Sequence, residues 1–219
     1  MERLFAIGDI HGCFDPLYEL IEQKIRIREG DRLVFIGDYI DRGNKSREVI
    51  DYILKLQENG FDIIPLLGNH ESMMLDALAN EQSEYNWFMN GGYETLHSFG
   101  IESLDELDTS YLHFFRNLSH YYIHDKFIFV HAGFNDEIIN PFEDKYQMIW
   151  SRNESYSNPV FNDKIIIHGH TPIPFSLCRQ GVRSDPKIIN IDTGCVYGDR
   201  GGYGHLTAIE LFTMQLFTV

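Results

Sequence analysis

Five short blocks of carboxylate, carboxamide and imidazole residues stand out in this sequence, and each follows a run of apolar residues. In chain order they are Gly8-Asp9-Ile10-His11-Gly12, Gly37-Asp38-Tyr39-Ile40-Asp41-Arg42-Gly43, Gly68-Asn69-His70-Glu71, His131-Ala132-Gly133 and His168-Gly169-His170-Thr171-Pro172. Such side chains are ligands for divalent metal ions. A two-metal hydrolytic site needs one protein ligand shared by both ions, and open positions for water and a phosphate. One Asp-x-His pair would be weak evidence, but five blocks in order indicate a single metal site.

The order GDIHG, GDYIDRG, GNHE, HAG and GHTP resembles the calcineurin-like metallophosphoesterases of the phosphoprotein phosphatase type. The resemblance is closest to small bacterial and phage serine/threonine protein phosphatases, and it spans about 160 residues. Asp-Arg-Gly at 41–43 and Glu71 favour these phosphatases, because the related symmetrical dinucleoside tetraphosphatases usually carry Ala-Arg-Gly and follow Asn-His with Asp. The resemblance implies one α/β domain over residues 1–219, a four-layer α-β-β-α sandwich around a central pair of mixed sheets.

The resemblance also implies which residues hold the metals: Asp9, His11, Asp38, Asn69, His131 and His170. Asp9 and His11 are two positions apart, so in an extended segment both side chains reach one cation. Asp38 is then the carboxylate that bridges both metals, and the remaining three residues complete the second site. Mixed oxygen and nitrogen ligation suits manganese or iron. We therefore expect two divalent ions as cofactors, Mn²⁺ or an Fe/Mn or Fe/Zn pair.

Four further residues are expected to act on the substrate. His70 follows Asn69 and would point away from the ligands in an extended segment. The resemblance makes His70 the general acid that protonates the leaving oxygen and Asp41 the carboxylate that orients it; a seventh metal ligand or a core histidine is the alternative. Arg42 and Arg152 are candidates for holding phosphate, because a guanidinium group matches two oxygens of the anion. For Arg152, an ordinary surface arginine is the alternative.

Several segments have two possible interpretations. His168 is expected to support the ligands rather than bind metal. Asn90-Gly91-Gly92 resembles a substrate-side segment of the bacterial phosphatases, but a turn that ends a helix fits equally well. The loop 193–204 holds five glycines and could cradle phosphate, although a flexible hairpin connection is the more ordinary interpretation. Tyr197 or Tyr203 could overhang the site from this loop.

The elements that position these blocks follow from the apolar pattern. Buried strands are predicted at 3–7, 33–36, 63–67, 127–130, 165–167, 187–191, 205–211 and 214–219. Helices are predicted at 15–25, with Asp15 as the N-cap, and at 45–58. Strands that alternate with helices indicate a largely parallel sheet, in which ligands gather beyond the carboxyl ends of the strands. Residues 72–125 are predicted to form a helical insertion, with helices around 72–80 and 104–118.

Composition and charge narrow the possible partners. The formal charge of −15 argues against nucleic acid, which is bound by clustered Lys and Arg. Cys13, Cys178 and Cys195 are an odd set without CxxC spacing, which indicates free thiols in a reducing compartment. A strand that begins at Arg3 leaves no room for a signal peptide, and no apolar stretch is long enough to span a bilayer. We expect a cytoplasmic protein without a membrane partner.

These features predict a metal-dependent phosphomonoester hydrolase. The leading expectation is a serine/threonine protein phosphatase in which a metal-activated hydroxide attacks the phosphorus of a phosphorylated protein or small phosphoester. Hydrolysis of a dinucleoside tetraphosphate or related nucleotide is the enzymatic alternative, because it uses the same cluster. A metal-stabilised binding scaffold is the non-enzymatic alternative, and the loss of His70, Asp41 or a ligand that would mark it is not seen. The sequence does not indicate an oligomeric state.

Overall fold

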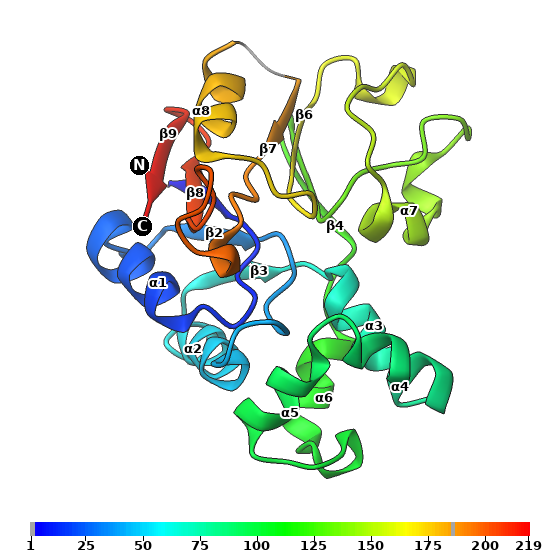
Figure 1. The fold of residues 1–219 in the computed structure, drawn as a ribbon. Helices are drawn as coiled ribbons and strands as arrows, with labels where there is room; N and C mark the ends of the chain where they lie inside the picture. Colours follow the sequence, from blue (N-terminus) through cyan, green and yellow to red (C-terminus); the bar gives the residue numbers. More distant parts are fainter. Residues whose placement is uncertain (1–2, 185–186) are drawn as a thin grey trace.

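Two mixed β-sheets with helices outside them make up the computed structural model, which describes residues 3–184 and 187–219 (Figure 1). The five-stranded sheet has the order β3 (Asp62–Pro65), β2 (Arg32–Phe35), β1 (Leu4–Ile7), β8 (Thr207–Glu210) and β9 (Gln215–Thr218). The four-stranded sheet has the order β4 (Tyr121–His124), β5 (Phe127–Val130), β6 (Ile165–His168) and β7 (Ile188–Asn190). The strands β1 to β3 are parallel, as are β5 to β7, whereas β8, β9 and β4 pair antiparallel. The predicted α/β fold with two central mixed sheets is confirmed.

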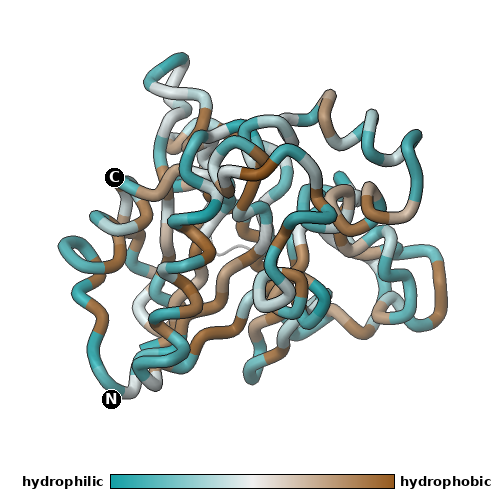
Figure 2. The backbone as a smooth tube through the Cα atoms, turned by 90° about the horizontal axis from the view of Figure 1, so that it is seen from below, coloured by the Kyte–Doolittle hydropathy of each residue, from teal (hydrophilic) through white to brown (hydrophobic). Residues whose placement is uncertain are grey.

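The central strands are apolar on both faces because each face packs against another layer. In β1, Leu4 and Ala6 belong to the core between the two sheets, while Phe5 and Ile7 belong to the core under the helices. The strand β5 divides its residues in the same way between the inner core and an outer core. Successive side chains of a strand point to opposite faces, so a continuous apolar run marks a strand buried on both sides. In Figure 2 hydrophobic stretches of the chain, coloured brown, run through the middle of the molecule, and many of the segments around them are hydrophilic and coloured teal.

Helices cover the outer faces of both sheets. The five-stranded sheet is covered by α1 (Phe14–Glu19), which continues into the π-helical segment η1 (Leu20–Ile25), and by α2 (Ser46–Glu58). The outer face of the four-stranded sheet packs against residues of α7 (Lys145–Trp150) and the short helix η4 (Pro159–Phe161), which follow η3 (Pro141–Glu143). The helix α8 (Phe175–Arg183) precedes β7, packs against it and contributes Cys178 to the core between the two sheets, so it does not cover an outer face. The layers are therefore helix, sheet, sheet and helix.

The first helix starts earlier than its sequence pattern predicts. The N-cap is Cys13, which makes no side-chain capping hydrogen bond, so the prediction of Asp15 as N-cap is wrong. Asp15 lies in the first turn, where both of its carboxylate oxygens accept hydrogen bonds from Lys45 Nζ, at 2.8 and 2.6 Å. A carboxylate in the first turn is also favoured by the helix dipole. Proline is tolerated throughout the first turn, so Pro16 does not fix the helix start to one residue.

The segment between β3 and β4 is more helical than predicted. It contains α3 (Asn69–Ala77), α4 (Glu81–Phe88), α5 (Gly92–Phe99), the 3₁₀ helix η2 (Leu104–Glu106) and α6 (Thr109–Arg116), shown from cyan to green in Figure 1. The helices predicted around 72–80 and 104–118 correspond to α3 and to η2 with α6, whereas α4 and α5 were missed. The predicted end of the insertion at 125 is also too late, because β4 already belongs to the sheet. Few apolar residues in α4 explain its weak helical signal.

The glycine-rich loop connects two sheets. Residues 193–204 lead from β7 in the four-stranded sheet to β8 in the five-stranded sheet, so the hairpin interpretation is wrong. All five glycines of the loop have positive φ, between 64° and 88°. The main-chain N–H groups of Tyr197 and Gly204 donate to the carbonyl of Gly194, each at 3.0 Å, and η5 (Cys195–Tyr197) lies inside the loop. Glycine adopts this left-handed conformation without steric cost, so the loop has a defined shape.

The cysteines and helices bear on two remaining expectations. Cys13, Cys178 and Cys195 are free thiols, as predicted. No helix within 3–184 and 187–219 has both the length and the apolar character that crossing a bilayer demands.

Candidate metal centre

The five blocks meet because the strands before them end at the same edge of the sandwich. Asp9 and Asp38 follow β1 and β2, Asn69 begins α3 after β3, and His131 and His170 follow β5 and β6. The main-chain N–H of His170 donates to Asp9 Oδ2 at 3.0 Å across 161 positions of sequence. The carboxyl ends of parallel strands collect distant residues in this way.

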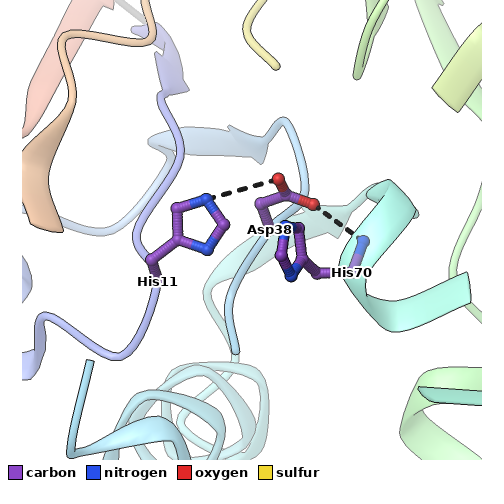
Figure 3. A group of neighbouring side chains, drawn as sticks. All are labelled: His11, Asp38 and His70. Atoms are coloured by element: carbon purple, nitrogen blue, oxygen red, sulfur yellow. Dashed lines mark hydrogen bonds and ion pairs between the residues drawn. The ribbon is translucent and has the colours of Figure 1, made fainter. Parts of the chain in front are cut away.

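Asp38 lies in the middle of the cluster. Its Oδ2 is 3.4 Å from His11 Nε2, and its Oδ1 accepts the main-chain N–H of His70 at 3.2 Å (Figure 3). The same Oδ1 is 3.5 Å from His131 Nε2. Two groups of possible ligand atoms, each within 4.8 Å of one another, share this carboxylate: His11, Asp38 and His70, and Asp38, His131 and His170. A carboxylate common to both groups is the arrangement that a bridging ligand requires.

Asn69 and Asp9 lie beside these groups. Asn69 Oδ1 is 2.9 Å from both His131 Nε2 and His170 Nδ1, so it belongs to the second group. Asp9 enters neither group, but its Oδ1 is buried without a hydrogen-bond partner among the described residues, and so is His170 Nε2. Buried polar atoms without partners are costly. Two such atoms within a set of carboxylate, amide and imidazole donors fit the binding of divalent cations.

Glycines leave room for the ligand carboxylates. A Cβ atom added at Gly68 would overlap Asp38 Oδ1, and one added at Gly169 would overlap Asp9 Oδ1. Any other residue at either position would displace a carboxylate. The close approach of the backbone to the ligand atoms therefore requires glycine in the third and fifth blocks.

The backbone of the site is unusual in its dihedral angles. Five non-glycine residues of the cluster have positive φ between 47° and 70°: His11, Asp38, Asp41, Arg42 and His170. Conformations of this kind cost on the order of 1 to 3 kcal/mol each and persist only where the surroundings fix them. Their concentration after three strands marks this edge as a candidate functional site independently of residue type.

Glu71 fixes the second ligand loop from inside the protein. Its Oε2 accepts hydrogen bonds from the main-chain N–H groups of Asp38 at 3.0 Å and Gly68 at 3.1 Å. Its Oε1 accepts those of Tyr39 at 2.8 Å and Ile40 at 3.2 Å. Burial raises the pKa of the Glu71 carboxyl to about 8. The Glu that marks the third block thus holds the backbone of the central Asp38.

His70 and Asp41 form a buried pair. His70 Nδ1 is 2.7 Å from Asp41 Oδ2, and both side chains are inaccessible to solvent. The expectation that His70 lies in an extended segment is wrong, because it is the second residue of α3. The helix starts at Asn69, and its first N–H groups have no partners within the helix. The N–H of His70 therefore donates to Asp38, while its side chain contacts Asp41.

The pKa of His70 shifts opposite to those of its neighbours. Burial lowers the pKa of four imidazoles at this edge: His11, His131, His168 and His170, the first and last to about 3. Neutral imidazole is the form that binds metal. Burial also disfavours the charged form of His70, but the carboxylates of Asp38 and Asp41 outweigh it and raise the pKa. A retained proton is what a general acid needs.

His168, predicted to play a supporting role, enters neither group of ligand atoms.

Arg42 and Arg152 lie at the rim of the cluster, and both side chains are exposed. Arg42 Nη1 is 2.8 Å from His11 Nε2, and the Arg42 guanidinium carbon is 6.0 Å from the centroid of the Tyr197 ring. Arg152 Nη1 donates to Thr171 Oγ1, next to the fifth block, at 2.7 Å. Two exposed guanidinium groups beside the ligands can bind the oxygens of a phosphate.

Asn90 and Gly91 form the turn between α4 and α5, and Gly92 begins α5, so the segment ends a helix as one interpretation predicted, while the substrate-side interpretation stays a prediction. Gly91 has a φ of 105°, and its carbonyl accepts the main-chain N–H of Arg42 at 3.3 Å. A Cβ at Gly91 would be 2.6 Å from the same nitrogen. The turn therefore shapes the loop that carries Arg42.

Asp192 is a buried carboxylate that the sequence reasoning missed. It follows β7, and its Oδ1 accepts the main-chain N–H of Gly194 at 2.9 Å. Burial raises the pKa of Asp192 to about 7, and after burial its charge is the main cause that raises the pKa of Asp9. A polar residue directly after an apolar strand was the available signal, but the segment Ile191-Asp192-Thr193 contains no histidine.

Comparison with known proteins defines the class. Residues 2–202 match the calcineurin-like phosphoesterase family, and the chain belongs to that family. It is 29% identical to bis(5'-nucleosyl)-tetraphosphatase PrpE (asymmetrical) of Anoxybacillus flavithermus, over 97% of this chain and 92% of the relative. It is 27% identical to serine/threonine-protein phosphatase 2 of Salmonella typhimurium, over 88% and 87%. A crystal structure of a candidate diadenosine tetraphosphatase shares the fold with a TM-score of 0.70 at 20% identity, over 99% and 92%.

The protein is therefore a metallophosphoesterase, a hydrolase whose family works with a dinuclear metal centre. Relatives named for both predicted substrates, a phosphoprotein and a dinucleoside tetraphosphate, cover most of the chain. Asp-Arg-Gly at 41–43 and Glu71 are expected to distinguish this chain from the symmetrical tetraphosphatases, whereas PrpE is named as an asymmetrical one. These residues therefore do not distinguish this chain from PrpE.

Proposed function

We propose that this chain hydrolyses phosphomonoesters of serine or threonine at two divalent cations, Mn²⁺ or a mixed iron pair. The proposed ligands are Asp9, His11, Asp38, Asn69, His131 and His170. The observation that carries the proposal is the carboxylate of Asp38, shared by two groups of ligand atoms next to the buried His70–Asp41 pair. When bound, two such cations polarise phosphoryl oxygens and make a water molecule acidic enough to act as a nucleophile.

In this proposal His70 supplies the proton that the leaving group needs. Asp41 accepts the hydrogen bond from Nδ1–H of His70, which fixes the ring and leaves Nε2 as the atom that donates its proton. A serine or threonine alkoxide is a poor leaving group, so protonation of the departing oxygen is worth roughly 10²- to 10⁴-fold in rate. The raised pKa of His70 supports this role. The geometry is also compatible with metal ligation by His70, because His70 lies in the first ligand group.

The two exposed arginines bind the phosphoryl group. Arg42 and Arg152 carry charge that offsets the dianion, and each guanidinium can donate two hydrogen bonds to its oxygens. Both lie on solvent-facing segments next to ligand blocks, so a phosphate can reach them without a change in the core. Donors placed around a reacting phosphate hold it and stabilise the charge that develops on it.

Hydrolysis of a dinucleoside polyphosphate is the second candidate. It is supported by the similarity to PrpE over almost the whole chain. The metal ligands, His70 and the arginines would act on an anhydride as they would on an ester. The two candidates differ in what surrounds the phosphate, because a dinucleotide brings further phosphates and two bases that need their own contacts.

One assay separates the candidates. Catalytic efficiency is measured side by side on a phosphoserine peptide, a phosphotyrosine peptide and diadenosine tetraphosphate with Mn²⁺ present. We expect the phosphoserine peptide to be the best substrate. A tenfold preference for the dinucleotide, about 1.4 kcal/mol of transition-state stabilisation, would make the second candidate the function. No turnover of any of the three by metal-loaded protein would favour the binding scaffold.

A further inference from the structure

The glycine-rich loop forms one side of a small hollow next to the metal centre. The hollow measures about 250 Å³ and is lined by four residues: Pro172, Tyr197, Arg200 and Tyr203. Ligand pockets for drug-sized molecules measure about 300–1,000 Å³, so this hollow suits a single ring system rather than a whole cofactor. Pro172 ends the fifth ligand block, which connects the hollow directly to the metal ligands.

The two tyrosine rings are held in place by the loop backbone. Tyr197 and Tyr203 meet edge to face, with centroids 6.4 Å apart. Both rings lie over Gly194, where an added Cβ would be 3.0 Å from each of them. The N–H of Tyr203 donates to the carbonyl of Arg200 at 3.2 Å, so the loop folds back and brings Arg200 next to the rings. The hollow is therefore formed by an ordered segment, although Tyr197 remains 45% exposed.

The position of the hollow relates it to the phosphate site. The guanidinium carbon of Arg42 is 6.0 Å from the Tyr197 centroid, while Arg42 Nη1 is 2.8 Å from His11 Nε2. Arg42 thus lies between the aromatic hollow and the metal ligands. The guanidinium group of Arg42 therefore separates a group in the hollow from the metal ligands. An aryl ring bonded directly to the phosphate is too close to fit both places.

We infer that this hollow binds the base of a nucleotide whose terminal phosphate occupies the metal centre. The rings of Tyr197 and Tyr203 can stack on any nucleobase, and Arg200 in the same hollow can add a cation–π contact with the base or a contact with a phosphate. A nucleotide places a ribose and one or more phosphates between its base and its terminal phosphate, which matches the separation set by Arg42. This inference relies on the proposed function only for the binding of the terminal phosphate at the metal centre. If the chain hydrolyses dinucleoside polyphosphates, the nucleotide is a substrate; if it hydrolyses phosphoserine or phosphothreonine, the nucleotide competes with the phosphoprotein.

Equilibrium binding of two ligands that resist hydrolysis tests the inference. The probes are α,β-methylene-ADP and methylenediphosphonate, which share the phosphonate end and differ in the nucleoside. Dissociation constants are measured by titration calorimetry on the full chain with Mn²⁺. In the wild type we expect the nucleotide to bind tighter by about 5- to 150-fold, the range given by one stacked base. Equal affinity for the two probes would overturn the inference.

Variants assign the effect to the hollow. Tyr203→Leu and Tyr197→Leu should each remove most of the preference for the nucleotide, whereas Tyr203→Phe should keep it because the ring remains. Tyr197 is partly exposed, so its variant is expected to fold even if Tyr203→Leu does not. Tyr85→Leu, which changes an exposed tyrosine on α4, is the matched control and should keep the wild-type ratio. An unchanged ratio in both leucine variants would sink the assignment.

Turnover of the phosphoserine peptide by the same preparations separates this inference from the proposed function. Hydrolysis without discrimination between the probes contradicts the nucleobase site alone. Discrimination without hydrolysis of any phosphoester contradicts the proposed function alone. Selective loss of phosphotyrosine-peptide turnover in the leucine variants, with an unchanged ratio of probe affinities, would mean that a peptide ring occupies the hollow and would also overturn the inference.

Discussion

The charge of Asp38 illustrates how single residues determine the properties of the site. Burial by itself raises the pKa of this carboxyl, but the imidazoles of His131, His70, His11 and His170 more than offset burial and lower it. The charged form of Asp38 is therefore favoured, and both of its oxygens face imidazole nitrogens. A carboxylate in this position can accept two cations, whereas a neutral amide cannot balance their charge.

The first prediction follows from this charge. Asp38→Asn should lower turnover more than about 100-fold, beyond the 10- to 100-fold that changes to the partners of metal ligands usually cause. It should also reduce the metal content measured by elemental analysis, with a much smaller effect on the unfolding midpoint. Two metals per chain together with near-normal turnover in this variant would contradict the bridging role.

The second prediction concerns His70. His70→Asn should reduce turnover of a phosphoserine peptide by roughly 10²- to 10⁴-fold and turnover of an activated aryl phosphate far less. An acidic phenol leaves without a proton, so it does not need the acid. The variant retains the main-chain N–H that donates to Asp38. Equal losses on both substrates, or a loss of bound metal, would mean that His70 is a ligand or a structural residue.

At the scale of elements, the helical insertion supports the proposed acid. The carboxylate of Asp41 accepts hydrogen bonds from Trp87 Nε1 on α4, at 3.0 and 2.9 Å, and from Thr95 Oγ1 on α5, at 2.7 Å. The main-chain N–H of Asp41 also donates to Thr95 Oγ1 at 2.9 Å. Burial raises the pKa of Asp41, and these donors oppose that rise. Helices without any ligand block therefore favour the charged form of Asp41 and hold its carboxylate in contact with His70.

The third prediction tests this support. Trp87→Phe keeps an aromatic ring in a fully buried position but removes a hydrogen bond to a charged group, so we expect a loss of about 1.5–3 kcal/mol in the free energy of unfolding. Turnover of the phosphoserine peptide should fall more than turnover of the aryl phosphate, because Asp41 no longer holds His70 as firmly. Urea denaturation and the two assays provide the measurements. Tyr85→Phe on the exposed side of α4 should match the wild type, and identical effects in both variants would contradict the role of Trp87.

At the scale of the whole molecule, the site edge concentrates buried acidic groups in a chain that already carries a formal charge of −15. Asp9, Asp38, Glu71 and Asp192 are all buried. Burial raises the pKa of Glu71 to about 8 and of Asp192 to about 7, against about 4 in an unfolded chain. Below about pH 6.5 the four buried histidines with lowered pKa oppose this effect, because they are protonated only in the unfolded chain. Between about pH 7 and pH 8 those histidines are mostly neutral in both states, so Glu71 and Asp192 make the metal-free folded state bind more protons than the unfolded state, and its stability falls as the pH rises.

The fourth prediction is that chelation destabilises the protein more at high pH. The melting temperature of the chelated protein should fall by several degrees from pH 7 to pH 8.5, since 1 kcal/mol corresponds to about 2–4 °C at this size. Saturating Mn²⁺ should raise the melting temperature at both pH values and reduce the difference, because cations that bind the folded state stabilise it. Asp192→Asn should weaken the pH dependence of the chelated protein. A melting temperature that rises between pH 7 and pH 8.5 would contradict the assignment of these groups.

Much of the fold and most of the candidate site could be read from local sequence. Strands such as Phe127–Val130 are predicted to the residue because the apolar run is short and consists of aromatic and β-branched residues, which favour a strand buried on both faces. The ligand blocks are recognisable because metal-binding side chains directly follow these runs. Boundaries were less certain where two local signals compete: Asn69 and His70 follow a strand, yet the hydrogen bonds of Glu71 begin a helix there.

The tertiary structure alone decided which distant residues meet. The sharing of Asp38 between two groups, the approach of Asp192 to Asp9 and the contact of Trp87 with Asp41 depend on strand order and on packing of the insertion, which local pattern does not encode. The course of the 193–204 loop likewise depends on whether β7 and β8 pair with each other or belong to different sheets. The residues of both strands would have the same apolar pattern in a hairpin and in two separate sheets. The residue types and the hydrophobic periodicity of the sequence thus determined which chemistry this chain can carry out. Long-range pairing of strands and helices determined where the reactive side chains come together, because contacts between segments far apart in sequence are not visible in any local sequence pattern.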